Sequence, residues 1–270
     1  MNKYFDTFYD WWKNIDKTIF FIIGLLFFLG LFFSLVSTSI IASDKLNTNS
    51  YYFFLKHLFF VSIGIFIILI FSLLDQNILI RLSVILFLIT LISLFLVPLF
   101  GIEVKGSKRW LDLGSLPRFQ PIETLKPFFV IVISLIISME KKNLYLKYLL
   151  STFVLMPIII LLLSQPDLGQ TLLVTSVWLA IIFVSGINLF LFTFSLALVS
   201  SLTLFLIFFV PKFNYIKIRL ISFLDTSGGK NYQADKASDA ISNGGFFGKG
   251  IGEGTLNSRI PEAHTDYIIS

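Results

Sequence analysis

Charged side chains that could bind an anion gather just before an apolar segment that starts near residue 121. They are Lys108, Arg109, Arg118, Glu123 and Lys126. Proline suits the first turn of a helix, where its missing N–H is not needed, and an acid there complements the positive end of the helix dipole. We therefore expect a helix to begin at Pro121. A diphosphate docked at its start would receive charge-assisted hydrogen bonds from Arg118 and Lys126.

A structural alternative exists for the acid and the base of this helix start. Glu123 and Lys126 stand three positions apart, so they share one helix face. They could form a local ion pair that makes the helix start tolerable beside lipid. Ionisable residues at membrane depth are costly and more often serve a function, which favours ligand binding here.

A second carboxylate of interest is Asp266, the last charged residue before a short apolar end of the sequence, residues 267–269. This position places the carboxylate at the mouth of a helix and partly out of water. Partial removal from water favours proton uptake, as a general base requires, and the nearby His264 could tune it. The alternative is a helix N-cap, for which aspartate is a preferred residue. The residues alone leave both interpretations open.

Two other segments have structural explanations. Pro166 and Asp167 join two apolar segments, and they are expected to start a helix and to complement its dipole. Six glycines lie between residues 244 and 254. No expected strand precedes them and no Gly-Lys-Ser/Thr closes them, so we exclude a nucleotide-binding loop. They more plausibly allow tight turns over a membrane surface.

The elements that position these residues are membrane helices. Of the 270 residues, 56% are hydrophobic and 14% are charged, and the mean hydropathy is +0.87. A bilayer crossing needs about 20 apolar residues. Apolar segments of this kind occupy residues 18–43, 51–74, 82–102, 121–139, 148–166 and 168–211. The last is too long for one crossing and is expected to break at the polar turn 185–188. We therefore predict an all-α transmembrane bundle of seven spans.

Composition excludes several kinds of site. The chain has no cysteine, which excludes disulfides, thiol catalysis and cysteine metal sites, and its two histidines exclude a histidine-rich metal centre. The net charge of +5 fits membrane association and gives no reason to expect nucleic acid. The first apolar segment is too long for a cleaved signal peptide and is expected to remain as a helix. With a cytoplasmic N-terminus, most basic residues would lie outside, against the usual bias.

The ordered set of motifs resembles the FtsW/RodA/SpoVE (SEDS) family, and most closely its FtsW branch. The matching blocks are residues 105–110, 118–126, 165–169, 223–225 and 232–233, the glycines at 244, 245, 248 and 250, and residues 261–266. The resemblance implies ten transmembrane helices with both termini in the cytoplasm. It divides this chain into a cytoplasmic segment 1–17, a seven-helix bundle 18–211 with a motif loop 103–122, an outer loop 212–266, and the start of an eighth helix at 267–270. The family continues beyond this point, so the 270 residues alone could be inactive.

The resemblance also implies a function, peptidoglycan glycosyl transfer that polymerises lipid II in septal wall synthesis. It places the catalytic carboxylate at Asp266 and diphosphate-binding bases at Arg118 and Lys126. Weaker candidates are Lys108 and Arg109 for the diphosphate, and Glu123, His264 and Glu262 in support. No cofactor is implied and no dedicated metal site is seen, although a divalent cation on the diphosphate is compatible with the chemistry.

The implied partners are a class B penicillin-binding protein and other membrane proteins of cell division, in the bacterial inner membrane at the septum. Two alternatives remain. A lipid II flippase should show polar groups near mid-membrane, and the long uncharged segments have few. A scaffold that only recruits the penicillin-binding protein would not need the carboxylate of Asp266.

Overall fold

The computed structural model describes residues 9, 11–38, 52–104, 107–114, 117–140, 143–224 and 232–245. The chain divides into two compact units, one of residues 75–221 and one of residues up to 74 with those from 222 onward. Nearly all described residues are helical, as a chain in lipid requires, because a helix satisfies its own backbone hydrogen bonds. The chain is a polytopic helical membrane protein.

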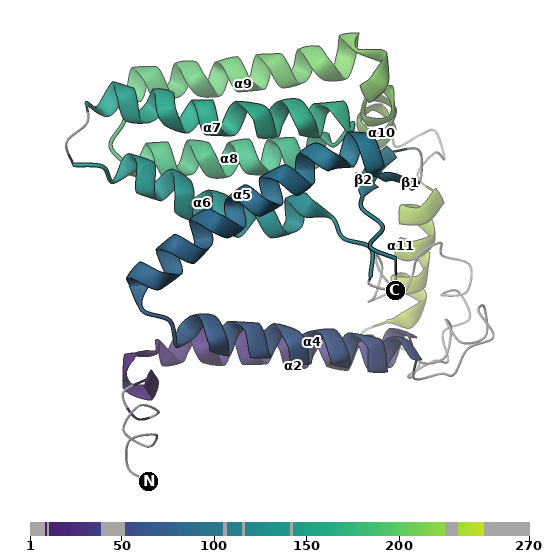
Figure 1. Cartoon of the computed structure of the whole chain (residues 1–270). Helices are drawn as coiled ribbons and strands as arrows, with labels where there is room; N and C mark the ends of the chain where they lie inside the picture. Colours follow the sequence, from purple (N-terminus) through teal and green to yellow (C-terminus); the bar gives the residue numbers. More distant parts are fainter. Residues whose placement is uncertain are drawn as a thin grey trace. The chain divides into compact units, whose positions relative to one another are not determined.

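The larger unit holds five apolar helices and a small hairpin. In chain order its elements are α5 Gln76–Phe100, β1 Ile102–Val104, β2 Ser107–Trp110, α6 Pro121–Ile137, α7 Leu144–Ser164, α8 Leu168–Val184, α9 Leu189–Phe209, the 3-10 turn η1 Pro211–Phe213, and most of α10 Asn214–Leu224. Helices α6, α7 and α8 contact one another, α5 packs on α6 and α7, and α9 packs on α8 (Figure 1).

Helix lengths agree with membrane crossings. Five described helices, α2, α4, α5, α7 and α9, are long and apolar enough to cross a membrane. Helices α6 and α8 have 17 residues each, at the lower end of the roughly 17–25 residues that a crossing needs. Together these helices fall on the apolar segments predicted from the sequence.

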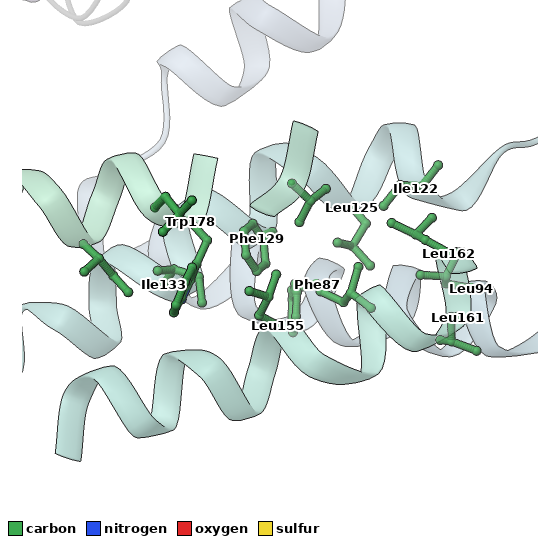
Figure 2. Packing of buried hydrophobic residues seen from close by; sticks show 14 residues of the cluster. Phe87, Leu94, Ile122, Leu125, Phe129, Ile133, Leu155, Leu161, Leu162 and Trp178 are labelled. Atoms are coloured by element: carbon green, nitrogen blue, oxygen red, sulfur yellow. The ribbon is translucent and has the colours of Figure 1, made fainter. Parts of the chain in front are cut away.

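A hydrophobic core holds α5 to α8 together. Residues Ile122, Leu125, Phe129 and Ile133 recur every three or four positions, so one face of α6 points inward. Figure 2 shows these side chains meeting those of the neighbouring helices, among them Phe87, Leu94, Leu155, Leu161, Leu162 and Trp178. The middle of this bundle is therefore closely packed and mostly apolar, with a few buried hydroxyls such as Thr90 and Thr175.

The smaller unit contains α2 Lys17–Thr38, α4 Tyr52–Ser72 and α11 Tyr232–Gly244. Helices α2 and α4 pack along each other. Asp16 caps α2, because its Oδ1 accepts hydrogen bonds from the backbone N–H groups of Thr18 and Ile19 at 2.8 and 3.1 Å. The start of the first span therefore lies where the sequence predicted it.

Local signals predicted most helix boundaries, with one correction. Helix α6 begins at Pro121 and α8 ends before the turn 185–188, where Gly186 has φ +85° and Asn188 caps α9. The expectation that Pro166 starts a helix is wrong. Asp167 is the N-cap of α8 and accepts from the Gln170 N–H at 3.3 Å, so Pro166 lies one residue before the cap.

The segment expected as the motif loop, residues 103–122, holds most of β1 and all of β2. They pair antiparallel, with Glu103 opposite Lys108 and Val104 opposite Ser107. Beyond the hairpin, Leu111 and Phe119 exchange backbone hydrogen bonds of 2.8 and 3.0 Å. The motif segment is thereby folded back on itself between α5 and α6. Helices α10 and α11 likewise lie inside the segment expected as an outer loop.

Candidate functional site

The start of α6 brings an acid and a base into contact. Pro121 occupies the first turn and Glu123 lies in it. The Lys126 ammonium lies 2.7 Å from the Glu123 carboxylate, which is 49% exposed. The Gln170 amide of α8 donates to the same carboxylate at 2.7 Å. Glu123 thus has two partners and Lys126 keeps donors that a ligand could use.

Arg118 lies three positions before this helix and is exposed. The pairing of Leu111 with Phe119 fixes the backbone beside it. Arg118 makes no hydrogen bond or ion pair with another described side chain, so its guanidinium is available to an anion near the helix start. Arg118 and Lys126 are the two bases that the sequence assigned to a diphosphate, and the fold places both at one end of α6.

Arg109 has a different environment, although the sequence analysis also named it as a candidate for binding the diphosphate. Its Nη2 donates to the Pro166 carbonyl at 2.8 Å, and its Nε lies 3.4 Å from both the Gln165 carbonyl and the Asp167 carboxylate. The Asp167 side chain is only 8% exposed. Arg109 therefore ties the hairpin to the turn between α7 and α8, which is a positioning role.

Lys108 points to a pocket of about 300 Å³ in the larger unit. Its polar lining includes Glu103, Lys108, Gln165 and Lys212. The Lys212 ammonium donates to the Ser164 carbonyl at 2.7 Å. Sequence reasoning missed Gln165 and Lys212 as site residues, because only the fold brings η1 next to the end of α7.

Three predicted site residues, Glu262, His264 and Asp266, lie outside the described residues. Their roles remain predictions. Among the residues that the structure describes, no group of three or more histidine, aspartate or glutamate side chains could hold a metal ion.

Comparison with known proteins gives a consistent result. A model of the family FtsW/RodA/SpoVE, described as cell cycle protein, matches residues 16–270. A probable peptidoglycan glycosyltransferase FtsW of Wigglesworthia glossinidia brevipalpis is 34% identical over 96% of this chain and 70% of its own length. The protein of the same name from Caulobacter vibrioides is 29% identical over 96% of this chain and 66% of its own. The chain thus spans about two thirds of the relatives it matches.

Two solved structures share the fold. A chain of a peptidoglycan synthase complex, in a study of how polymerization and crosslinking are coordinated, superposes with a TM-score of 0.64 at 23% identity, over 88% of this chain and 67% of that one. A mutant of the rod shape determining protein RodA from Thermus thermophilus gives 0.57 at 23% identity, over 70% and 60%.

Proposed function

We propose that this chain, which belongs to the FtsW/RodA/SpoVE family of cell cycle proteins, polymerises lipid II into glycan strands as a peptidoglycan glycosyltransferase of cell division. The observation that carries the proposal is the placing of Arg118, Glu123 and Lys126 at the start of α6, where Arg118 and the Glu123 carboxylate are exposed and Lys126 is partly exposed. Relatives aligned over nearly all of this chain are named probable peptidoglycan glycosyltransferases.

The proposed reaction joins two lipid-linked disaccharides at the outer membrane face. The acceptor 4-hydroxyl oxygen attacks the donor anomeric carbon, and Asp266 accepts the proton of that hydroxyl. The bond from that carbon to the diphosphate breaks, and undecaprenyl diphosphate leaves with the electron pair. Arg118 and Lys126 stabilise the charge that develops on the leaving group.

Glu123 holds the base in place in this scheme. Its carboxylate contacts both Lys126 and Gln170, so the position of the Lys126 ammonium is set from α8 as well as from α6. His264 and Glu262 are proposed to support Asp266. Lys108 is proposed to add positive charge, and Arg109 to place the hairpin. A divalent cation could accompany the diphosphate without a dedicated protein site.

The proposal extends to partners and location. One solved chain with this fold belongs to a peptidoglycan synthase complex that coordinates polymerization and crosslinking. We therefore assign a class B penicillin-binding protein as the partner, which crosslinks the new strand, with other membrane proteins of cell division nearby. The corresponding location is the bacterial inner membrane at the septum, with the hairpin and the start of α6 on the outer face.

The packing of the larger unit argues against a flippase. A path for a polar headgroup needs polar groups across the bundle, yet its middle is formed by residues such as Phe129, Ile133 and Ile158, which are at most 1% exposed. The buried amide and carboxylate, of Gln165 and Asp167, lie at one end. The other buried polar side chains among the described residues are small hydroxyls, and those of Thr90, Ser151, Thr171 and Thr175 donate to carbonyls three or four positions earlier on the chain. This arrangement favours chemistry at the membrane surface.

The test is glycan-strand formation from purified lipid II by the full-length protein with its penicillin-binding protein. We expect polymer from the wild type and none from Asp266→Ala. Asp112→Ala is the matched control, because Asp112 is exposed and, within the described residues, its carboxylate accepts only from the Gly114 N–H, at 2.9 Å. Equal polymer from Asp266→Ala would reject Asp266 as the base, and no polymer from the wild type would return weight to a scaffold.

A further inference from the structure

The pocket beside the hairpin is lined by Gln165 and Lys212, to which the proposed chemistry gives no role. It lies where the last turn of α5, the hairpin, the end of α7 and η1 meet, and its volume is about 300 Å³. This is at the small end of the roughly 300–1,000 Å³ of small-molecule sites. Its lining combines two lysines, one acid and one buried amide.

The buried amide belongs to Gln165, which is 3% exposed. Its Nε2 has no hydrogen-bond partner within the described structure. Leaving such a donor unpaired in a buried site is costly, so native proteins generally give it a partner. A ligand oxygen in the pocket would supply one.

The two lysines provide further donors from other sides. Lys212 uses one of its three N–H groups on the Ser164 carbonyl, which fixes the ammonium and leaves two donors. Lys108 is exposed at the hairpin, directly across from Glu103. The charged lining therefore sums to one net positive charge, which does not suit a cation.

A phosphate group matches this set of donors, because it offers several acceptor oxygens and negative charge to lysines approaching from different directions. The pocket is also distinct from the start of α6 in its residues. Lys126 is paired with Glu123, and Arg109 is held by the turn between α7 and α8. Neither belongs to the pocket lining.

We infer that this pocket, with Lys108, Gln165 and Lys212, is a second phosphate-binding site that holds the diphosphate of one of two lipid-linked substrates. The assignment to a substrate rests on the proposed function, since a polymerase that joins two lipid-linked substrates must hold two diphosphate groups. Arg118 and Lys126 then serve the other group.

The experiment measures binding of inorganic pyrophosphate to the protein in phosphatidylcholine nanodiscs by isothermal titration calorimetry. We expect Lys212→Gln and Lys108→Gln each to weaken the pocket's binding about tenfold, the effect of one lost charge-assisted hydrogen bond. Gln165→Met, which keeps the side-chain length and removes the donor, should weaken it as well. Lys217→Gln is the control, because Lys217 lies over the Phe208 ring and does not line the pocket.

Unchanged pyrophosphate binding in Lys212→Gln and Lys108→Gln would overturn the inference, and so would loss of all binding in Lys126→Gln. Both lysines are exposed, so these variants test the site even if Gln165→Met fails to fold. Nanodiscs of phosphatidylglycerol separate the two sources of phosphate. The inference expects pyrophosphate still to bind there, whereas full displacement would assign the pocket to ordinary lipid headgroups.

Polymerisation is measured separately on the same variants. A wild type that binds pyrophosphate in the pocket but makes no polymer would refute the proposed function and leave the pocket standing as a phosphate site. A wild type that makes polymer while Lys212→Gln polymerises equally well would refute the substrate assignment alone.

Discussion

Helices α6 and α8 both start beside a proline and an acid, but the two acids have different surroundings. Glu123 at the start of α6 is 49% exposed, and its ion pair with Lys126 spans three positions of one helix. Asp167 at the start of α8 is 8% exposed, and its partner Arg109 comes from the hairpin. The two bases are similarly exposed, Lys126 at 25% and Arg109 at 29%, so the contrast lies in the acids. A half-exposed acid in a local pair can exchange its partner for a ligand at small cost, whereas a buried acid paired with a distant segment holds the fold.

The strongest way to break this comparison is Asp167→Ala. It removes the cap of α8 and leaves Arg109 partly buried without its carboxylate, so we expect the free energy of unfolding to fall by about 2–4 kcal/mol. The measurement is reversible unfolding in detergent micelles with increasing denaturing detergent. Asp167→Asn is the matched variant, because it keeps a capping oxygen and should lose less. A stability equal to wild type in Asp167→Ala would contradict the structural role.

The sequence predicted α6 and the turn 185–188 because their signals are local. Pro121 fixes the backbone angle φ in the first turn of α6, and Gly186 allows the positive φ of its turn. Both effects are local and do not depend on the surrounding fold. The same reasoning failed for Pro166, because the Asp167 side chain caps the helix and moves its start past the proline.

The hairpin and the pocket could not be predicted in this way. Strands of three and four residues carry almost no periodicity, and β2 is held by pairing with β1 and by packing on α5. Gln165 and Lys212 belong to segments that meet only in the fold. Arg109 and Lys108 are neighbours in sequence with the same charge, yet only the structure shows that one is tied to a turn and the other faces a pocket.

A smaller effect is expected from Arg109→Lys, which keeps the charge of the hairpin base. Lysine cannot reproduce the planar fork that reaches both the Pro166 carbonyl and the Asp167 carboxylate. We expect a loss of about 1–2 kcal/mol in the free energy of unfolding, measured as for Asp167→Ala. A loss of unfolding free energy as large as that of Asp167→Ala would contradict this prediction, because it would mean that the retained positive charge contributes nothing.

The connection between the two helix starts is tested by Gln170→Met. The Gln170 amide donates to Glu123 at 2.7 Å, so the variant removes one hydrogen bond at nearly constant size. We expect about 0.5–1.5 kcal/mol of destabilisation together with a lower rate of polymerisation, because Glu123 loses its contact with α8. A normal rate would show that Lys126 is positioned from α6 alone.

The smallest change in stability is expected for Glu123→Gln. Ion pairs three positions apart on a helix contribute about 0.2–0.5 kcal/mol, and the Glu123 carboxylate is half exposed, so the unfolding transition should barely move. High salt should reduce even this difference, since screening weakens exposed pairs. A loss above about 2 kcal/mol would place Glu123 in the same class as Asp167 and would remove the contrast.

If the start of α6 serves chemistry while the start of α8 serves the fold, Lys126→Gln should separate activity from stability. The measurement is glycan-strand formation from lipid II by Lys126→Gln, at equal amounts of folded protein and with the penicillin-binding protein present. We expect an unfolding transition close to wild type and polymerisation reduced at least about 100-fold, as for loss of one electrostatic contact to a transition state. Polymerisation by Lys126→Gln at the wild-type rate would contradict a catalytic role for the start of α6.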